Sequence, residues 1–331
     1  MNGFCKDVLL ALLMGIVVPA MILGVVVGLD SWNDARTEGQ TSCAPDETSR
    51  EPVTLPPQVT IPVMGQNGEV VQIELETYLC GVVLAEMPAD FEMEALKAQS
   101  VVARTYALRR LVKGTKHSQG AVCMDSTCCQ GYLTADVYLD RGGTQAEITK
   151  INQAVLSTAG EVVTYNGELI DATYFSCSGG TTEDALAVWG NDVPYLQATD
   201  SPGEEEAVHF TDSVTFTPQE VEQALGITLE GEPESWFSIH SYTDGGGVGE
   251  LTVCGSVFTG VQMRSLLSLR STDFSVTAED DAITIVTHGY GHRVGLSQYG
   301  ADAMAAGGSS YEQILTHYYS GTCVVQYQVE D

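Results

Sequence analysis

The sequence predicts a mixed α+β fold, with helices and short antiparallel strands in two lobes, preceded by one transmembrane helix. Three observations predict this class. Residues 8–29 form an apolar run, residues 75–112 carry an apolar stripe of helical period, and two Asn-Gly pairs stand between short alternating runs. Apolar residues three and four apart indicate helices, whereas Asn-Gly between alternating runs signals a β-hairpin.

The N-terminus predicts a membrane anchor. Residues 8–29 are apolar apart from small residues and one proline, which is long enough to span a bilayer. Lys6 precedes this run, whereas Asp30, Asp34 and Glu38 follow it, so the body is expected outside the cytoplasm. A cleaved signal peptide is the alternative, and it would need a shorter apolar region and a small-x-small cleavage site. We expect residues 1–30 to be a cytoplasmic tip and anchor, 31–57 a polar linker, and 58–331 the folded body.

The composition excludes some classes of partner. The apolar and aromatic content is that of a folded protein. With 14 Lys and Arg against 44 Asp and Glu, the formal net charge is −30. Nucleic acid and anionic lipid surfaces would both be repelled, so neither is expected as a partner.

A hairpin and a first helix open the body. Residues 58–75 predict a hairpin that turns at residues 66–68. Leu75, Leu79, Val82 and Val83 then form a helical apolar stripe, and Glu86 continues it. The Pro at position 88 ends the helix. Burial and the negative end of the helix dipole both raise the pKa of such a carboxyl, as a general acid requires.

A second helix is expected from an N-cap at Asp90 to about residue 112. Its core-facing residues would be Leu96, Ala103, Ala107 and Leu111. Lys97 and Arg104 lie two turns apart and share another face. They would either orient a buried Glu86 or form a buried salt bridge, and the residues alone favour the salt bridge.

The spacing His117-x5-Cys123-x5-Cys129 suits a tetrahedral zinc site with a fourth position left over. A disulfide between Cys123 and Cys128 or Cys129 is the alternative for a body outside the cytoplasm. Spacing alone does not separate the two. The chain has nine cysteines, and those at positions 80, 177, 254 and 323 have no local partner.

The remaining elements follow in order. Residues 146–158 predict a helix with positions 148, 151, 155 and 156 inside, and a hairpin follows that turns at Asn166-Gly167. The loop SCSGGTT offers hydroxyls and bare backbone N–H groups, which suit a sugar or an N-acetyl group, although it could also be a plain glycine turn. Residues 203–281 are acidic, with helices and a strand pair, and would form a second lobe or a docking surface. A strand at 283–287, a turn with His288 and His292, and a helix from about Ser297 end the body.

Three separated stretches resemble the stage II sporulation protein D family, whose members are lytic transglycosylases that cut peptidoglycan during engulfment in endospore-forming bacteria. They are YLCGVVLAEMPADFEMEALKAQSVVARTYAL, then YFSCSGGTT followed by WG and PYLQATDSP, and finally GHRVGLSQYGA. The resemblance runs from about residue 61 to residue 322. It implies that Glu86 is the catalytic acid, accompanied by Lys97, Gln99 and Arg104.

The resemblance also implies a cofactor and a substrate groove. Some clostridial members hold zinc through one His and two Cys, which map onto His117, Cys123 and Cys129, with Cys128 an open alternative to Cys129. The ion would be structural, shaping the cleft beside Glu86. The residues expected to line the groove are Gln99, Tyr174, Ser176, Ser178, Gly179, Gly180, Tyr195, His292, Gln298 and Tyr299.

The chain departs from the family pattern at three places. Gln197 stands where members often carry Lys, and Gly203 followed by Glu204 stands where an acidic residue often follows the Ser-Pro pair. Arg293 replaces a glycine and adds bulk and charge. These departures weaken any cationic contact near Tyr195 and predict a changed backbone near His292, which we expect to be structural or substrate-contacting rather than catalytic.

The resulting expectation is a membrane-anchored lytic transglycosylase, with its body outside the cytoplasm and facing the intermembrane space in a sporulating cell. It would act on peptide-stripped glycan strands. The resemblance implies two partners, the sporulation amidase stage II sporulation protein P and another engulfment membrane protein. The alternatives are a non-catalytic glycan-binding amidase enhancer and a zinc-dependent amidase or peptidase.

Overall fold

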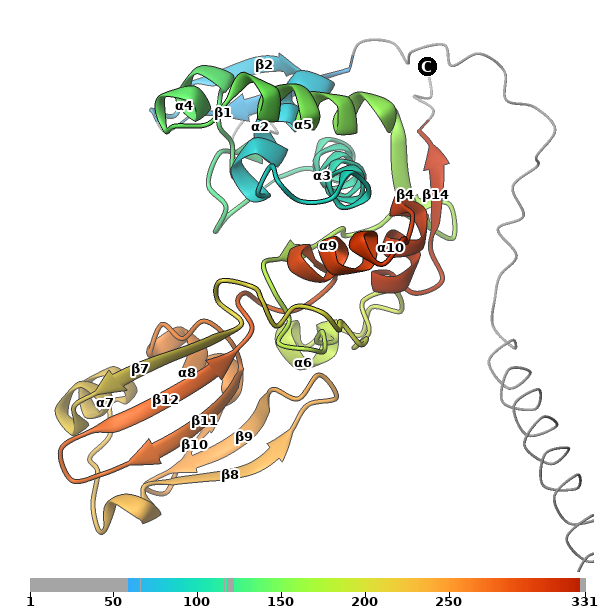
Figure 1. Ribbon diagram of the computed structural model, residues 1–331. Coiled ribbons are helices and arrows are strands. Elements are labelled where there is room, and N and C mark those ends of the chain that lie inside the picture. The colour runs from blue at the N-terminus through green and yellow to red at the C-terminus, as the bar shows by residue number, and fades with distance from the viewer. Residues whose placement is uncertain (1–58, 66, 116, 118–121, 328–331) are drawn as a thin grey trace, which may run out of the picture. The chain divides into compact units, whose positions relative to one another are not determined.

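The computed structural model describes residues 59–65, 67–115, 117 and 122–327, all within one compact unit, Arg50–Asp331 (Figure 1). The anchor and linker expected at residues 1–57 lie outside the described residues. Within the described ranges, no helix is both long enough and apolar enough to cross a membrane. Helices and short strands are both present, so the mixed α+β class is confirmed.

The expected first hairpin is confirmed. Strands β1 (Thr60–Met64) and β2 (Val70–Glu74) pair antiparallel. A third strand, β3 (Val122–Cys123), pairs parallel with the end of β1. This pairing places Cys123 in a small sheet, and therefore fixes one thiol of the predicted metal site.

The two helices that follow are helix α2 (Leu75–Glu86) and helix α3 (Met93–Lys113). Helix α2 ends where predicted. Helix α3 begins later than expected, with Glu92 and not Asp90 as its N-cap, because the N–H of Phe91 bonds the carbonyl of Pro88 in a turn. Leu111, expected in the core, is 42% exposed.

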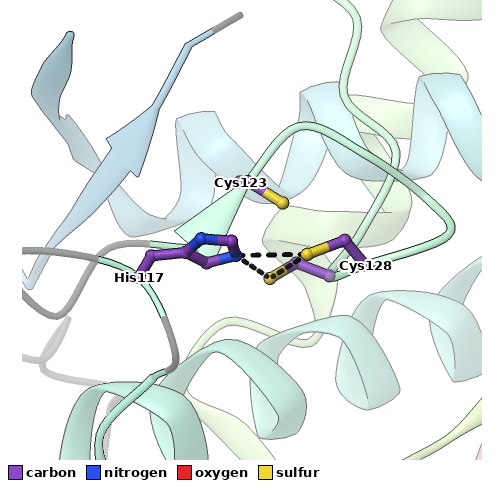
Figure 2. Close-up of side chains that lie close together, drawn as sticks. His117, Cys123 and Cys128 are labelled. Atoms are coloured by element: carbon purple, nitrogen blue, oxygen red, sulfur yellow. Dashed lines mark hydrogen bonds between the residues drawn. The ribbon is translucent and has the colours of Figure 1, made fainter. Parts of the chain in front are cut away.

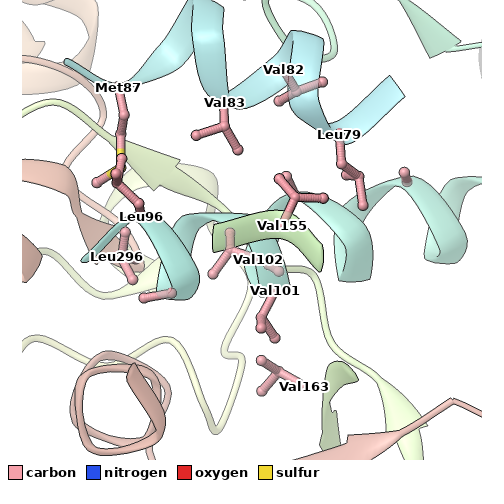
Figure 3. Close-up of a cluster of buried hydrophobic side chains, with 14 of the residues drawn as sticks. Leu79, Val82, Val83, Met87, Leu96, Val101, Val102, Val155, Val163 and Leu296 are labelled. Atoms are coloured by element: carbon pink, nitrogen blue, oxygen red, sulfur yellow. The ribbon is translucent and has the colours of Figure 1, made fainter. Parts of the chain in front are cut away.

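Helices α2 and α3 pack on helix α5 (Gln145–Ser157), which begins with a Thr144–Glu147 capping box after the short helix α4 (Ala135–Asp140). Strands β4 (Glu161–Tyr165) and β5 (Glu168–Leu169) form the predicted hairpin at Asn166-Gly167, and β14 (Cys323–Gln326) pairs with β4. Leu156, expected inside, is 60% exposed. Figure 3 shows how side chains of α2, α3, α5 and β4 meet in one core. Their packing fixes the end of α2, where Glu86 lies.

The acidic region expected as a second lobe or docking surface has a hydrophobic core of its own. Strands β7 (Thr211–Phe216), β11 (Asp273–Ala278) and β12 (Ile283–His288) form one sheet, and β8 (Phe237–Tyr242), β9 (Val248–Val253) and β10 (Ser256–Thr259) form another. Helices α7 (Pro218–Leu225) and α8 (Gly260–Leu266) and the short 3-10 helix η2 (Pro233–Ser235) complete it. The core includes Trp236, Leu251, Met263 and Ile285.

The remaining elements carry the motif residues. Strand β6 (Tyr174–Phe175) pairs parallel with β13 (Leu296–Ser297), which brings together two motifs more than 100 residues apart. Helix α6 (Ala185–Trp189) follows the first motif. Helices α9 (Gln298–Ala306) and α10 (Tyr311–Tyr318) follow the second.

Candidate functional site

The carboxyl group of Glu86 lies half-buried at the last residue of α2. Its Oε1 accepts a hydrogen bond of 2.5 Å from the backbone N–H of Gly131. Burial raises the pKa of Glu86 above its ordinary value, against the opposing effects of the bonds from Gly131 and Tyr174. The result is a carboxyl that holds its proton to higher pH than an exposed one, as expected from the sequence.

A chain of polar side chains supports Glu86. The hydroxyl of Tyr174 bonds its carboxylate, and burial raises the pKa of Tyr174, which keeps that hydroxyl protonated. The amide nitrogen of the buried Gln130 donates to the hydroxyl of Tyr174 (3.3 Å), and the hydroxyl of Tyr78 donates to the amide oxygen of Gln130 (3.3 Å). Gln130 and Gly131 were not predicted, although they directly follow the Cys128-Cys129 pair.

Glu86 opens into a cavity of about 600 Å³. Four residues predicted to contact substrate line it, namely Tyr174, Ser176, His292 and Gln298. Gln298 is only 7% exposed, and its Nε2 has no hydrogen-bond partner among the described residues. The sequence reading missed other lining residues, which include Tyr106, Arg110, Arg264 and Tyr290.

Lys97 and Arg104 do not reach Glu86. Arg104 is fully buried, and its guanidinium pairs with both carboxylate oxygens of Glu76, at 2.6 and 3.0 Å. Lys97 pairs with Glu94 at 2.6 Å and lies over the ring of Tyr311. The expectation that they orient Glu86 is corrected, because other carboxylates hold both cations. The alternative of a buried salt bridge describes Arg104.

Gln99 does not line the cavity either. Its side chain is fully buried within α3, and neither amide atom has a hydrogen-bond partner among the described residues. Arg104 instead lines a separate, mostly apolar cavity of about 570 Å³ between α2 and α5, from which Glu86 is absent. We assign the site to the cavity that contains the perturbed carboxyl, because burial of apolar surface alone supplies no chemistry.

The loop after β6 turns its polar groups inward. The backbone N–H groups of Ser178 and Gly179 and the hydroxyl of Ser178 all donate to Oε2 of Glu204. The hydroxyl of Ser201 donates to Oε1 of the same carboxylate. The N–H of Gly180 donates to the Ser178 hydroxyl. The expected sugar contacts of these three loop residues are therefore not supported, because their donors are already used.

Tyr195 and Tyr299 also lie away from the cavity lining. The hydroxyl of Tyr195 accepts the N–H of Asp171, and its ring packs against Tyr165. The ring of Tyr299 packs edge-on against Phe91, with centroids 5.0 Å apart. Both side chains are used in packing, so their expected substrate contacts are not supported by this geometry.

His292 lines the cavity but is held as a neutral ring. Its Nδ1 accepts the N–H of Val294 (3.1 Å), and the ring packs against Phe175 and Trp189. Burial, with the nearby Arg264 charge, lowers the pKa of His292 to about 4. A neutral, packed imidazole matches the expectation of a structural or substrate-contacting residue.

Arg293, which stands where the family pattern has glycine, has a buried side chain with its own partners. The residue has φ +65°, the left-handed region that glycine adopts without strain. Its buried guanidinium donates to the carbonyls of Ser178, Thr181 and Gly245, and it pairs with Glu183 at 3.4 Å. Arg293 therefore points away from solvent and joins the loop after β6 to the β8–β9 turn.

Four side chains gather as a candidate metal centre. The ligand atoms of His117, Cys123, Cys128 and Cys129 all lie within 4.8 Å of one another. Figure 2 shows the imidazole of His117 facing the thiol of Cys128. The Nε2 of His117 lies 3.2 Å from Cys128 Sγ and 3.5 Å from Cys129 Sγ. Cys123 and Cys129 form no disulfide, so the disulfide alternative is not supported. Cys323, which the sequence left unpaired, is disulfide-bonded.

This donor set fits zinc. Thiolates on one tetrahedral zinc ion lie about 3.8 Å apart, given Zn–S bonds of about 2.3 Å. The Sγ atoms of Cys128 and Cys129 are 4.0 Å apart. Both thiols belong to the cluster of four ligand atoms that lie within 4.8 Å of one another, so the geometry does not favour one of them over the other. Three thiols and one imidazole supply a complete tetrahedral set.

Comparisons with known proteins show which family this chain is similar to. A family model described as "Stage II sporulation protein" matches residues 64–165. The chain is 39% identical to the stage II sporulation protein D of Bacillus subtilis over 269 residues, which cover 80% of this chain and 78% of that protein. It is 36% identical to the protein of the same name from Bacillus amyloliquefaciens, over 87% of this chain and 83% of that one. It is also 30% identical to a B. subtilis protein named amidase enhancer, over 75% of this chain and 40% of that protein.

Proposed function

The chain belongs to the stage II sporulation protein D family, which has a role in sporulation, and from this premise we propose that it is a lytic transglycosylase acting on peptidoglycan glycan strands. One observation carries the proposal. Glu86 is the only carboxylate among the described residues that line the cavity, and its pKa is raised. Hydrolytic glycosidases use two carboxyl groups separated by roughly 5 to 10 Å.

A single carboxyl suffices when the substrate supplies its own nucleophile. Protonated Glu86 gives its proton to the glycosidic oxygen between N-acetylmuramic acid and N-acetylglucosamine. The resulting carboxylate then takes the proton of the muramic 6-hydroxyl as that oxygen attacks C1, which closes a 1,6-anhydro ring. Glu86 ends protonated and ready for the next strand, so acid and base roles alternate on one group.

The neighbouring side chains support both halves of this cycle. Tyr174 donates to the carboxylate, which stabilises the ionised form that exists between the two proton transfers. The N–H of Gly131 fixes the orientation of Oε1. The Nε2 of Gln298 has no hydrogen-bond partner in the part of the chain that the structure describes, so it is a donor for a substrate carbonyl or hydroxyl, such as an N-acetyl oxygen.

The metal centre is proposed to hold zinc in a structural role. His117, Cys123, Cys128 and Cys129 would be its ligands, and the ion would cross-link β3 to the segment that carries Gln130 and Gly131. Four protein ligands leave no position for a reacting water. This arrangement favours the transglycosylase over the alternative of a zinc amidase or peptidase.

The cellular setting remains part of the proposal. We place residues 1–30 as a single membrane anchor with the body outside the cytoplasm, and the two regions with separate cores as lobes beside the groove. The sporulation amidase stage II sporulation protein P and another engulfment membrane protein are the proposed partners.

A non-catalytic amidase enhancer is the second candidate function, favoured by the likeness to a protein of that name.

The test is mass spectrometry of glycan fragments after incubation of the full chain with amidase-stripped peptidoglycan. Products ending in 1,6-anhydromuramic acid are expected from the wild type and from Glu92→Gln, a matched change of an exposed glutamate. Glu86→Gln should lower the rate by about 10² to 10⁴-fold. Reducing-end products would indicate hydrolysis instead, and no cleavage by folded, zinc-loaded protein would favour the enhancer.

A further inference from the structure

Two arginines lie at the groove of this strongly acidic protein. Arg110 of α3 and Arg264 of α8 both line the cavity that contains Glu86. The chain has 14 Lys and Arg against 44 Asp and Glu, yet the described lining of this cavity holds two guanidinium groups and one carboxyl. The local balance of charge is therefore the reverse of that of the whole chain.

Arg264 has no ion-pair partner within the described ranges. Its Nε donates to the carbonyl of Arg270 (3.2 Å), and its Nη1 and Nη2 groups make no hydrogen bond to a described residue. By contrast, Arg270 pairs with Asp212 at 2.6 Å. Burial lowers the pKa of Arg264, as expected for a buried guanidinium without a carboxylate partner among the described residues. The free edge of a guanidinium is shaped for two-point contact with a carboxylate.

Arg110 adds a second, partly compensated charge. Its guanidinium stacks on the ring of Tyr106, with 4.8 Å between the guanidinium carbon and the ring centroid. Its nearest carboxylate is Asp171, at 3.4 Å, and Arg109 shares that carboxylate at 3.6 Å. One carboxylate between two guanidinium groups leaves net positive charge at this wall of the cavity.

We propose that Arg264, assisted by the charge of Arg110, forms a carboxylate-binding subsite that recognises the free lactyl carboxylate of a muramic acid residue. The inference rests on the proposed glycan substrate and names the part of it that the subsite contacts. A muramic residue that still carries its stem peptide has an amide in place of this carboxylate. The subsite would supply a physical basis for the action on peptide-stripped strands that the family resemblance implies.

Arg104 is not available for this contact. Arg104, the arginine of the ART motif, is committed to Glu76 and fully buried, so it has no group to offer a ligand. Elsewhere on a molecule of net charge −30, an anionic strand meets repulsion. Recognition of the carboxylate thus depends on the few cations that line the groove.

Direct binding tests this inference without relying on turnover. The full chain carrying Glu86→Gln is titrated with two probes, namely amidase-stripped glycan strands and the same strands with their lactyl carboxylates converted to methylamides. We expect the methylamide strands to bind about tenfold more weakly, because a charge-assisted hydrogen bond is lost. This comparison changes only the ligand, so it holds even where an arginine variant fails to fold.

The variants then assign the contact to Arg264. Arg264→Gln, in the Glu86→Gln background, should weaken binding of the free-carboxylate strands about tenfold and leave the methylamide strands unaffected. Arg264→Lys should keep part of the preference for free-carboxylate strands, because lysine keeps the positive charge but lacks the planar guanidinium that makes a two-point contact. Arg141→Gln, at an exposed position outside the cavity lining, is the matched control and should bind both strands as its parent does.

Two outcomes would overturn the subsite. One is equal binding of the two kinds of strand, and the other is an Arg264→Gln variant that loses affinity for both by the same factor. Failure of the wild type to cleave either strand would count against the transglycosylase, whereas charge-selective binding would still support the subsite. Cleavage of both kinds of strand, bound with equal affinity, would support the transglycosylase and contradict the subsite.

Discussion

The backbone N–H of Gly131 bonds the carboxylate of Glu86 across 45 residues of chain. Gly131 comes two residues after Cys129, whose thiol belongs to the candidate metal centre. A Cβ on Gly131 would lie 2.9 Å from Oε1 of Glu86 and 3.3 Å from the Cβ of Ala85, so a side chain here would displace the acid. The position of the acid therefore depends on the segment that the metal would hold.

Removal of the metal should disturb stability and activity together. Chelation, or Cys128→Ser, is expected to lower Tm on the order of 5 °C or more, because an ion bound only by the folded state stabilises it. Metal content by mass spectrometry and Tm by calorimetry check this. Cys254→Ser, a change of a thiol outside the cluster, is the control. Loss of activity at unchanged Tm would instead point to a metal-activated water.

The pH dependence of stability should reveal Glu86. Its folded-state pKa is raised, so the folded protein favours the protonated form, and ionisation above the ordinary pKa costs stability as pH rises. Glu86→Gln removes this cost and keeps a hydrogen-bond acceptor. The Tm of the variant should match the wild type near pH 4 and exceed it at pH 8. A constant difference at every pH would show that the carboxyl is not perturbed.

The activity should also depend on pH through the protonation of Glu86. Cleavage needs protonated Glu86, so kcat should fall as pH rises through the raised pKa of this group. Tyr174→Phe removes a donor that favours the ionised form, so the alkaline limb of the profile should move to higher pH. Rate profiles of both proteins on stripped strands measure the shift, and identical profiles would remove Tyr174 from the mechanism.

The Arg104–Glu76 pair should contribute to the stability of the fold and not to catalysis. Arg104→Ala leaves Glu76 without its cation and should cost about 3–5 kcal/mol in the free energy of unfolding. Lys97→Ala, at a partly exposed pair, should cost at most about 1 kcal/mol. Urea denaturation of the two variants gives both values. A stable Arg104→Ala protein with a lowered kcat would return Arg104 to the catalytic role that its motif suggested.

The substitution of glycine by Arg293 should be stabilising in this chain. Arg293→Gly relieves a left-handed backbone worth about 1 kcal/mol. It also leaves the buried Glu183 uncompensated, at a cost of about 3 kcal/mol or more. The variant should therefore unfold at lower urea concentration, and adding Glu183→Gln should recover part of the loss. A more stable Arg293→Gly protein would mean that backbone strain dominates.

Local patterns predicted the elements well because each depends on nearby residues. The apolar stripe that ends at Glu86 predicts both the helix and the buried position of its carboxyl group, and the His-Cys spacing predicts which residues gather as the candidate metal centre. The wrong predictions concern burial, which depends on how the helices pack in the folded protein. Leu111 and Leu156 have the helical spacing of core residues, but both lie near the ends of their helices and are exposed.

The partners of charged residues could not be predicted from the same patterns. Helical spacing placed Arg104 on a face but could not show that Glu76, 28 residues earlier, would be its carboxylate. The bonds from Ser178 to Glu204 and from Arg293 to Ser178 link positions 26 and 115 residues apart. Such pairings follow from the packing of whole elements. The residues that hold a site in place are therefore harder to predict from the sequence than the acidic residue of the site.

The carboxylate of Glu204 accepts the backbone N–H groups of the turn at Ser178 and Gly179. Consecutive backbone N–H groups in such a glycine turn form an anion nest, the kind of concavity that captures phosphate or sulfate. A ligand tethered to the same chain acts at an effective concentration on the order of millimolar or above. Free phosphate is therefore a poor competitor for this turn, because the carboxylate of Glu204 already accepts its N–H groups.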